Sequence, residues 1–177
     1  MFHPNTQRLI DYWRAKKGAA PVLARSRLDP AEIAGLLPRV FMAERSDGGY
    51  RLRLAGQFIV DAHAGAKAGD DLLSLWSAED RWEVRRMLDR ALAGAAPIVI
   101  AAEMGSERGR VHCLEIAFAP VCADGGPPDR FLGLYQSLGG VPGHLLAGRL
   151  RLTRAEADSV PPPRALRLAA VDGLRIA

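Results

Sequence analysis

Three strand-like runs follow one another in the second half of the 177-residue chain, at residues 97–104, 110–121 and 130–138. The two segments between them, 105–109 and 123–129, are rich in glycine, serine, proline and aspartate, which favour turns. Consecutive strands joined by short turns pair antiparallel, because a parallel pair needs a crossover of about a dozen residues or more. The sequence therefore predicts a three-stranded antiparallel meander.

One strong helix is predicted before this meander, over residues 78–93. Ser77 is the expected cap, carboxylates occupy the first turn, where the helix dipole favours them, and Gly94 ends the helix. Its apolar side chains recur at the spacing i, i+4, i+7 and i+8, and they are Val84, Leu88, Ala91 and Leu92. This stripe indicates a helix that packs one face on the sheet.

A hairpin signal and an irregular block lie ahead of the helix. The runs 40–44 and 50–56 flank an Asp-Gly-Gly turn at 47–49, which is typical of an antiparallel pair of strands. Glycines then interrupt residues 57–76, so we expect short helical turns joined by loops there.

Residues 1–36 are predicted to form a helical cap. An amphipathic helix begins at a capping Asn5 or Thr6 and stops at Gly18, and Asp-Pro at 29–30 starts a second, short helix. The core is then expected over 37–140.

Residues 141–177 form the predicted C-terminal extension. A short helix is expected at 153–156, and the proline triplet at 161–163 blocks helix continuation. Six arginines and three acidic residues give this segment +3 of the chain's net charge of +4. That excess is too dilute to favour binding of nucleic acid or an anionic membrane over a solvated extension.

Composition points to a soluble cytoplasmic protein. With 49% hydrophobic residues, the chain can bury a proper core. The first residues do not resemble a secretory leader, and no apolar run reaches the roughly 18 residues of a membrane span. Cys113 and Cys122 lie outside any CxxC pair, so we expect two free thiols.

Four short motifs follow one another along the chain, and they are Tyr-Trp at 12–13, LARSRLDP at 23–30, LPRVFMAE at 37–44 and YRLRLAGQFI at 50–59. Together they resemble a compact bacterial family of PAS domains that often occur as stand-alone proteins. The resemblance covers residues 9–138 and implies an α+β PAS fold, in which helices flank a five-stranded antiparallel sheet. No catalytic activity follows from such a fold.

The resemblance also implies a small pocket between the inner face of the sheet and the helices. Candidate lining residues are Phe58, His63, Leu72, Trp76, Trp82, Leu88, Ile100, His112, Leu114, Ile116 and Tyr135. One of the two tryptophans is expected to border the cavity. Each histidine has two interpretations, because a histidine beside apolar residues is more often a hydrogen-bonded structural residue than a ligand contact.

The sequence does not identify a cofactor. Haem-binding PAS domains often use a histidine on the long helix, and residues 78–93 contain none. Flavin-adduct photoreceptors need a cysteine in the short-helix block, and residues 57–76 contain none. Neither HExxH nor a paired CxxC occurs, so no metal site is predicted.

Function is therefore expected to be binding. The chain is predicted to be a sensor or adaptor that takes a small ligand, docks on a histidine kinase or another signalling protein, or does both. Leu9, Ile10 and Trp13 must bury against the sheet or a partner, which suggests a homodimer. The alternative is a small α+β enzyme with His63 or Asp61 as the base in the cavity.

Overall fold

The computed structural model describes residues 2–106, 109–123 and 125–157. One curled sheet dominates it, with the strand order β3-β2-β6-β5-β4-β7, and β1 pairs in parallel with β5. The strands are β1 (Leu23–Ala24), β2 (Val40–Ser46), β3 (Gly49–Ala55), β4 (Ile98–Ser106), β5 (Val111–Cys122), β6 (Arg130–Ser137) and β7 (Leu146–Ala157). The predicted hairpin is β2 and β3, and the predicted meander is β4, β5 and β6, so both predictions are confirmed.

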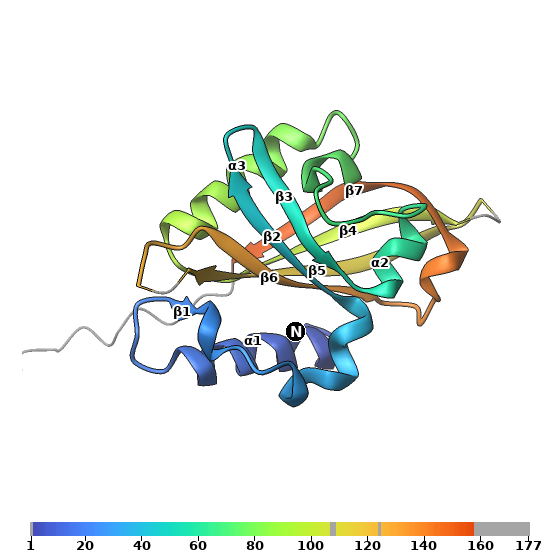
Figure 1. Cartoon of the computed structure of the whole chain (residues 1–177). Coiled ribbons are helices and arrows are strands. Elements are labelled where there is room, and N and C mark those ends of the chain that lie inside the picture. The colour runs from blue at the N-terminus through green and yellow to red at the C-terminus, as the bar shows by residue number, and fades with distance from the viewer. Residues whose placement is uncertain (1, 107–108, 124, 158–177) are drawn as a thin grey trace, which may run out of the picture.

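Helices cover both faces of this sheet, as Figure 1 shows. The α-helices are α1 (Pro4–Lys17), α2 (Gln57–Ala62) and α3 (Arg81–Ala93), and the 3-10 helices are η1 (Arg25–Arg27), η2 (Pro30–Arg39), η3 (Leu72–Leu75) and η4 (Gly143–Leu145). The α3 helix begins three residues later than predicted, and its stripe of Val84, Leu88, Ala91 and Leu92 is buried as expected.

Side chains that alternate along the strands build two separate cores. On β5, Leu114, Ile116 and Phe118 point to the inner face, where they join α2, η3 and α3. Ala117 and Ala119 point to the outer face, where they join α1 and η2. Because successive side chains of a strand leave on opposite faces, one sheet serves both cores.

The N-terminal helix packs on the outer face of its own sheet. Leu9 and Ile10 are fully buried, and Trp13 is 2% exposed, all within the outer core. These three side chains are therefore already covered within one chain. The apolar face of α1 thus packs on the sheet, which is one of the two partners expected for it, and these side chains are not exposed to a second subunit.

The C-terminal segment extends the sheet beyond the five strands that were expected. β7 pairs antiparallel with β4 along most of its length, with two irregularities in register. The helix predicted at 153–156 is wrong, because pairing with the edge of β4 holds these residues extended. The proline triplet at 161–163 lies outside the described residues.

Residues 69–77 tie the two edges of the sheet together. At one edge, the Leu52 N–H donates to the carbonyl of Asp70 at 2.9 Å, and the Gly69 N–H donates to the carbonyl of Leu52 at 2.7 Å. At the other edge, the Ser77 N–H donates to the carbonyl of Leu150 on β7 at 2.8 Å. The inner core is thus enclosed by the sheet, by α2 and α3, and by this edge-joining segment, residues 69–77.

Candidate functional site

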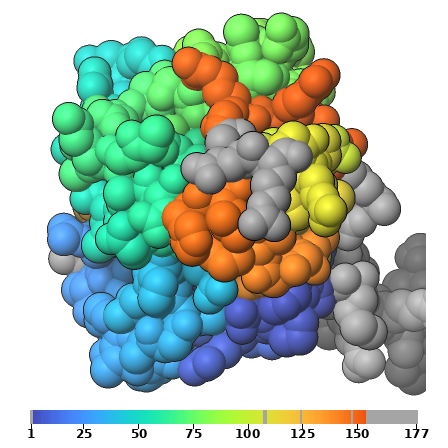
Figure 2. All heavy atoms as spheres, turned by 90° about the vertical axis from the view of Figure 1, so that its right-hand side faces the viewer, coloured from blue at the N-terminus to red at the C-terminus, as the bar shows by residue number. Residues whose placement is uncertain are grey.

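A pocket of about 380 Å³ opens where α2, the edge-joining segment and β7 meet. Figure 2 shows this side of the molecule, with the segment around α2 and η3 beside the segment that leads into β7. The lining residues come from both segments, and they are His63, Ala64, Gly65, Ala66, Asp70, Ser74, Leu75, Gly148 and Arg149. The pocket therefore joins the body of the domain to its last described strand.

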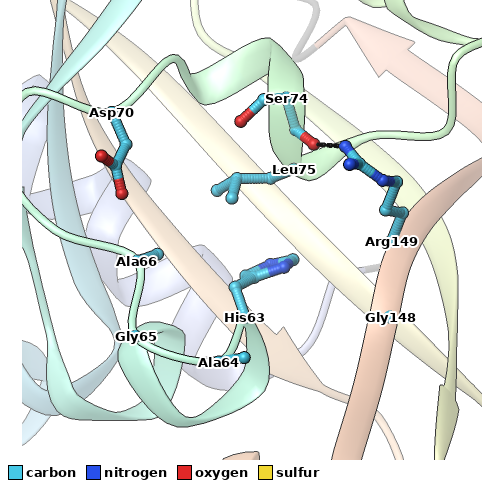
Figure 3. A pocket seen from close by; sticks show the side chains of 9 residues that line it. All are labelled: His63, Ala64, Gly65, Ala66, Asp70, Ser74, Leu75, Gly148 and Arg149. Atoms are coloured by element: carbon cyan, nitrogen blue, oxygen red, sulfur yellow. Dashed lines mark hydrogen bonds between the residues drawn. The ribbon is translucent and has the colours of Figure 1, made fainter.

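Local backbone geometry shapes one wall of the pocket. α2 ends at Ala62, and the chain reverses direction through Ala64 and Gly65, whose φ angles are +52° and +97°. On β7, Gly148 has a φ of +108°, a conformation that glycine adopts without the steric cost of a side chain. This turn after α2 leaves His63 and Ala66 facing the pocket across from β7 (Figure 3).

His63 is the most strongly perturbed titratable group in the pocket. Burial lowers the pKa of its imidazole to about 4, while a hydrogen bond with the Gly148 backbone opposes that shift and the charge of Arg149 adds to it. Its ring packs edge-on against Tyr135, with 5.7 Å between the centroids. Nε2 is buried without a hydrogen-bond partner among the described residues.

Arg149 and Asp70 lie at opposite ends of the pocket in Figure 3, with Leu75 and His63 between them. The Arg149 guanidinium donates to the carbonyl oxygen of Ser74, and no ion pair to it occurs in the described part of the chain. One oxygen of Asp70, Oδ2, accepts the Lys67 N–H at 3.0 Å. The pocket thus carries one positive and one negative end over an apolar floor.

Two further polar groups are buried in the inner core next to this site. The hydroxyl of Tyr135 and the indole Nε1 of Trp76 have no hydrogen-bond partner among the described residues. Burial raises the pKa of Tyr135 far above its usual range, so its hydroxyl keeps its proton. Each such group costs free energy unless something satisfies it.

Most of the predicted pocket residues pack together in the inner core. These are Phe58, Leu72, Trp76, Leu88, Ile100, Leu114, Ile116 and Tyr135. Among all the candidates, His63 alone is part of the lining of the 380 Å³ pocket. The other wall residues, Asp70, Ser74 and Arg149, were not predicted as site residues.

Two candidates lie elsewhere. Trp82 is 71% exposed on the outer side of α3, with the Arg86 guanidinium 5.4 Å from its ring centroid, so it does not border a cavity. It lies two positions before Val84, about half a turn away from the buried stripe. His112 lines a different hollow of about 260 Å³ with Ser106 and Val141, so the structure does not bring the two histidines into one site.

The two cysteines of the chain both lie on one strand of the sheet. Cys113 is exposed and Cys122 is buried, both on β5 and both unpaired, as predicted. In the described part of the chain, no group of three or more histidine, cysteine, aspartate or glutamate side chains is placed to hold a metal ion. No helix formed by the described residues has both the length and the apolar character needed to cross a membrane.

A curled antiparallel sheet in the order β3-β2-β6-β5-β4, with short helices and one long helix on its inner face, defines the class of PAS-type α+β domains. The comparison with family models agrees, since the model described as "PAS domain" matches residues 1–136. The chain belongs to the PAS domain family.

Solved structures with a similar course of the chain include light-oxygen-voltage (LOV) proteins. "Structure of RsLOV d2 variant" is 17% identical, with a TM-score of 0.48 over 61% of this chain and 65% of that chain. The LOV protein of Rhodobacter sphaeroides is 15% identical, with a TM-score of 0.47 over 64% and 70%. "Structure of an RNA-binding Light-Oxygen-Voltage Receptor" is 15% identical, with a TM-score of 0.46 over 66% and 35%. This chain therefore spans just under two thirds of the first of these chains and about a third of the third. No curated protein matches the sequence.

Proposed function

We propose that the chain is a sensory PAS domain that binds a small ligand in the pocket beside His63 and passes the signal to another protein by contact. The observation that supports this proposal is the composition of the pocket wall. His63 and Leu75 belong to the body of the domain, and Arg149 belongs to β7. A ligand that touches both sides would change how firmly β7 is held, and the chain continues directly beyond that strand.

The volume of the pocket suits a small metabolite. Ligand sites in proteins usually occupy about 300–1,000 Å³ and combine apolar walls with a few polar groups. This pocket, at about 380 Å³, lies at the lower end of that range, and it combines Leu75 with polar groups of His63 and Arg149. A molecule the size of an amino acid or a short organic acid is therefore a better candidate than a large planar cofactor.

We infer that the domain acts without catalysis. The alternative of a small enzyme needs a base that is poised near neutral pH and lies beside the substrate. The imidazole of His63 has a pKa of about 4, which makes it a weak base, and Asp61 accepts a hydrogen bond from Gln57 outside the pocket lining. Both observations favour binding over proton transfer.

The partner is proposed to be a signalling protein such as a histidine kinase, in the cytoplasm, where an exposed thiol like that of Cys113 stays reduced. Nucleic acid is not the proposed partner, because the excess of positive charge is small.

A homodimer stays a prediction, and it must use a surface other than Leu9, Ile10 and Trp13. Sedimentation velocity at micromolar concentration tests it, and a purely monomeric species would rule it out.

The ligand proposal is tested by native mass spectrometry with an absorbance scan of freshly purified protein, followed by an NMR screen of small metabolites. A true ligand should shift the amide signals of residues 63–66, 74–75 and 148–149. Ser74→Trp, which fills the pocket, should abolish the shifts, and Ala78→Trp, at an exposed position outside the lining, should preserve them. A screen in which no compound shifts these signals, or one in which Ser74→Trp binds normally, would remove the proposal.

A further inference from the structure

The charges at the two ends of the pocket restrict the chemistry of its occupant. Arg149 presents a guanidinium whose one described partner is a neutral carbonyl, that of Ser74. Asp70 presents a carboxylate, and its Oδ2 accepts a single backbone N–H while no partner of its Oδ1 is found in the described residues. Both side chains line the same cavity, and Figure 3 shows them on opposite sides of it.

A ligand of one sign would meet an unfavourable charge in this pocket. An anion drawn to Arg149 would lie in the field of Asp70, and a cation drawn to Asp70 would lie in the field of Arg149. Like-charge proximity costs free energy. A molecule that carries both charges meets a complementary group at each end.

The middle of the pocket supports the same conclusion. Leu75 is 8% exposed and Ala66 is 4% exposed, so they offer a short apolar surface between the charged ends. The Nε2 atom of His63 is buried without a described partner, so it adds no charge to this middle part of the pocket. An apolar linker between two charged groups fits this order of features.

We propose that the pocket binds a small amphoteric molecule, with its carboxylate on Arg149 and its ammonium group on Asp70. This inference rests on the proposed ligand-binding function and adds the class of ligand. Arg149 suits the carboxylate, because a guanidinium can donate two parallel hydrogen bonds to it. Asp70 belongs to the edge-joining segment and Arg149 to β7, so such a ligand would link the two across the pocket.

The test uses the whole chain and a matched set of probes. The amphoteric probes are β-alanine, γ-aminobutyrate and δ-aminovalerate, which differ in the length of the linker. Butyrate and butylamine each carry one of the two charges, and butanol carries neither. Each probe is titrated into isotopically labelled protein, and affinity is taken from the amide shifts of residues 63–66, 74–75 and 148–149.

At least one amphoteric probe should bind about ten-fold more tightly than butyrate, butylamine or butanol, since each charge-assisted hydrogen bond adds to the affinity. Arg149→Gln should lower the affinity for that probe about ten-fold and should not lower the affinity for butylamine. Asp70→Asn should weaken it similarly and leave butyrate no weaker. Arg151→Gln, an exposed arginine two residues along β7 and outside the lining, is the control and should change nothing.

The outcomes separate this inference from the proposed function. Butanol or another uncharged molecule binding as tightly as the amphoteric probes would overturn the inference and leave the pocket a ligand site. The same holds if Arg149→Gln and Asp70→Asn, with well-dispersed spectra, bind the amphoteric probe as the parent chain does. A folded parent chain that none of the three amphoteric probes perturbs would also overturn it, whatever other metabolite the broader screen finds.

Discussion

Trp13 on α1 and Pro120 on β5 are joined by a buried hydrogen bond, in which the indole Nε1 donates to the carbonyl oxygen at 2.6 Å. The two residues are separated by 107 positions in the sequence. A proline cannot donate a hydrogen bond, but its carbonyl still needs a donor when it is buried. The N-terminal helix supplies that donor, and it is thereby fixed on the outer face of the sheet.

Replacing Trp13 should destabilise the protein in two steps. Trp13→Phe keeps much of the apolar contact and removes the donor, so we expect a loss of about 1–3 kcal/mol in the free energy of unfolding. Trp13→Ala also leaves a cavity, and the loss should reach about 3–5 kcal/mol. Urea unfolding measures both. Trp82→Phe, at an exposed tryptophan, is the control and should stay within about 0.5 kcal/mol. Equal losses at the two tryptophans would contradict the position given to α1.

Gly133 on β6 leaves no room for a side chain. A Cβ atom at this position would collide with the aromatic ring of Phe41 on β2, which is fully buried beside it. Gly133→Ala should therefore cost about 1–3 kcal/mol or more, because a packed core does not yield easily. Gly126→Ala places its Cβ with no heavy atom within 4 Å and should be nearly neutral. Thermal unfolding of the pair tests this, and two equal melting temperatures would show that Phe41 can move aside.

His63 should make stability depend on pH below neutrality. Its pKa is about 4 in the folded chain and about 6.5 in the unfolded one, so the unfolded chain binds the proton first as the pH falls. Stability is then lost between pH 6.5 and pH 4, by about 3 kcal/mol for this group, and is constant again below that range. His63→Gln should remove this part of the pH dependence. Subtracting the free energy of unfolding of His63→Gln from that of the parent chain at each pH removes most of the contribution from carboxylates. A difference that does not change with pH would refute the assignment of this pH dependence to His63.

The hydroxyl of Tyr135 should be dispensable for folding. Because it is buried without a described partner, Tyr135→Phe is expected to be neutral or to stabilise by up to about 1 kcal/mol. Tyr50→Phe is the matched control, since the hydroxyl of Tyr50 donates to Oδ1 of Asp89 at 2.7 Å. That change should cost about 1–2 kcal/mol. A larger loss at Tyr135 than at Tyr50 would mean that a bound molecule satisfies the Tyr135 hydroxyl.

The strands and the long helix could be predicted from the sequence because their signals are local. The Asp-Gly-Gly turn and the stripe of α3 each lie within about a dozen residues, and each appears in the structure where the pattern predicts it. The exposure of Trp82 also follows from helical periodicity, since it lies off the line through Val84 and Leu88.

The pocket could not be predicted in the same way, because its wall depends on pairing between distant segments. Leu150 and Leu152 alternate with Arg149 and Arg151, which is a strand pattern, yet Thr-Arg-Ala-Glu at 153–156 also resembles the start of a helix. Contact with the edge of β4 decides between the two. Arg149 therefore lines the same pocket as His63 only through a register that no local rule specifies.

The hydrogen bonds that residues 69–77 make at Leu52 and at Leu150 have a consequence for association. Proteins that bind extended peptides commonly do so by adding the peptide as one more strand at an exposed edge of a sheet. In this domain, residues 69–77 already hydrogen-bond to the middle of each edge strand. A strand from another protein would therefore not find a continuous row of free backbone donors and acceptors on β3 or β7. A partner protein is therefore expected to bind through contacts with side chains and not by adding a strand to the sheet.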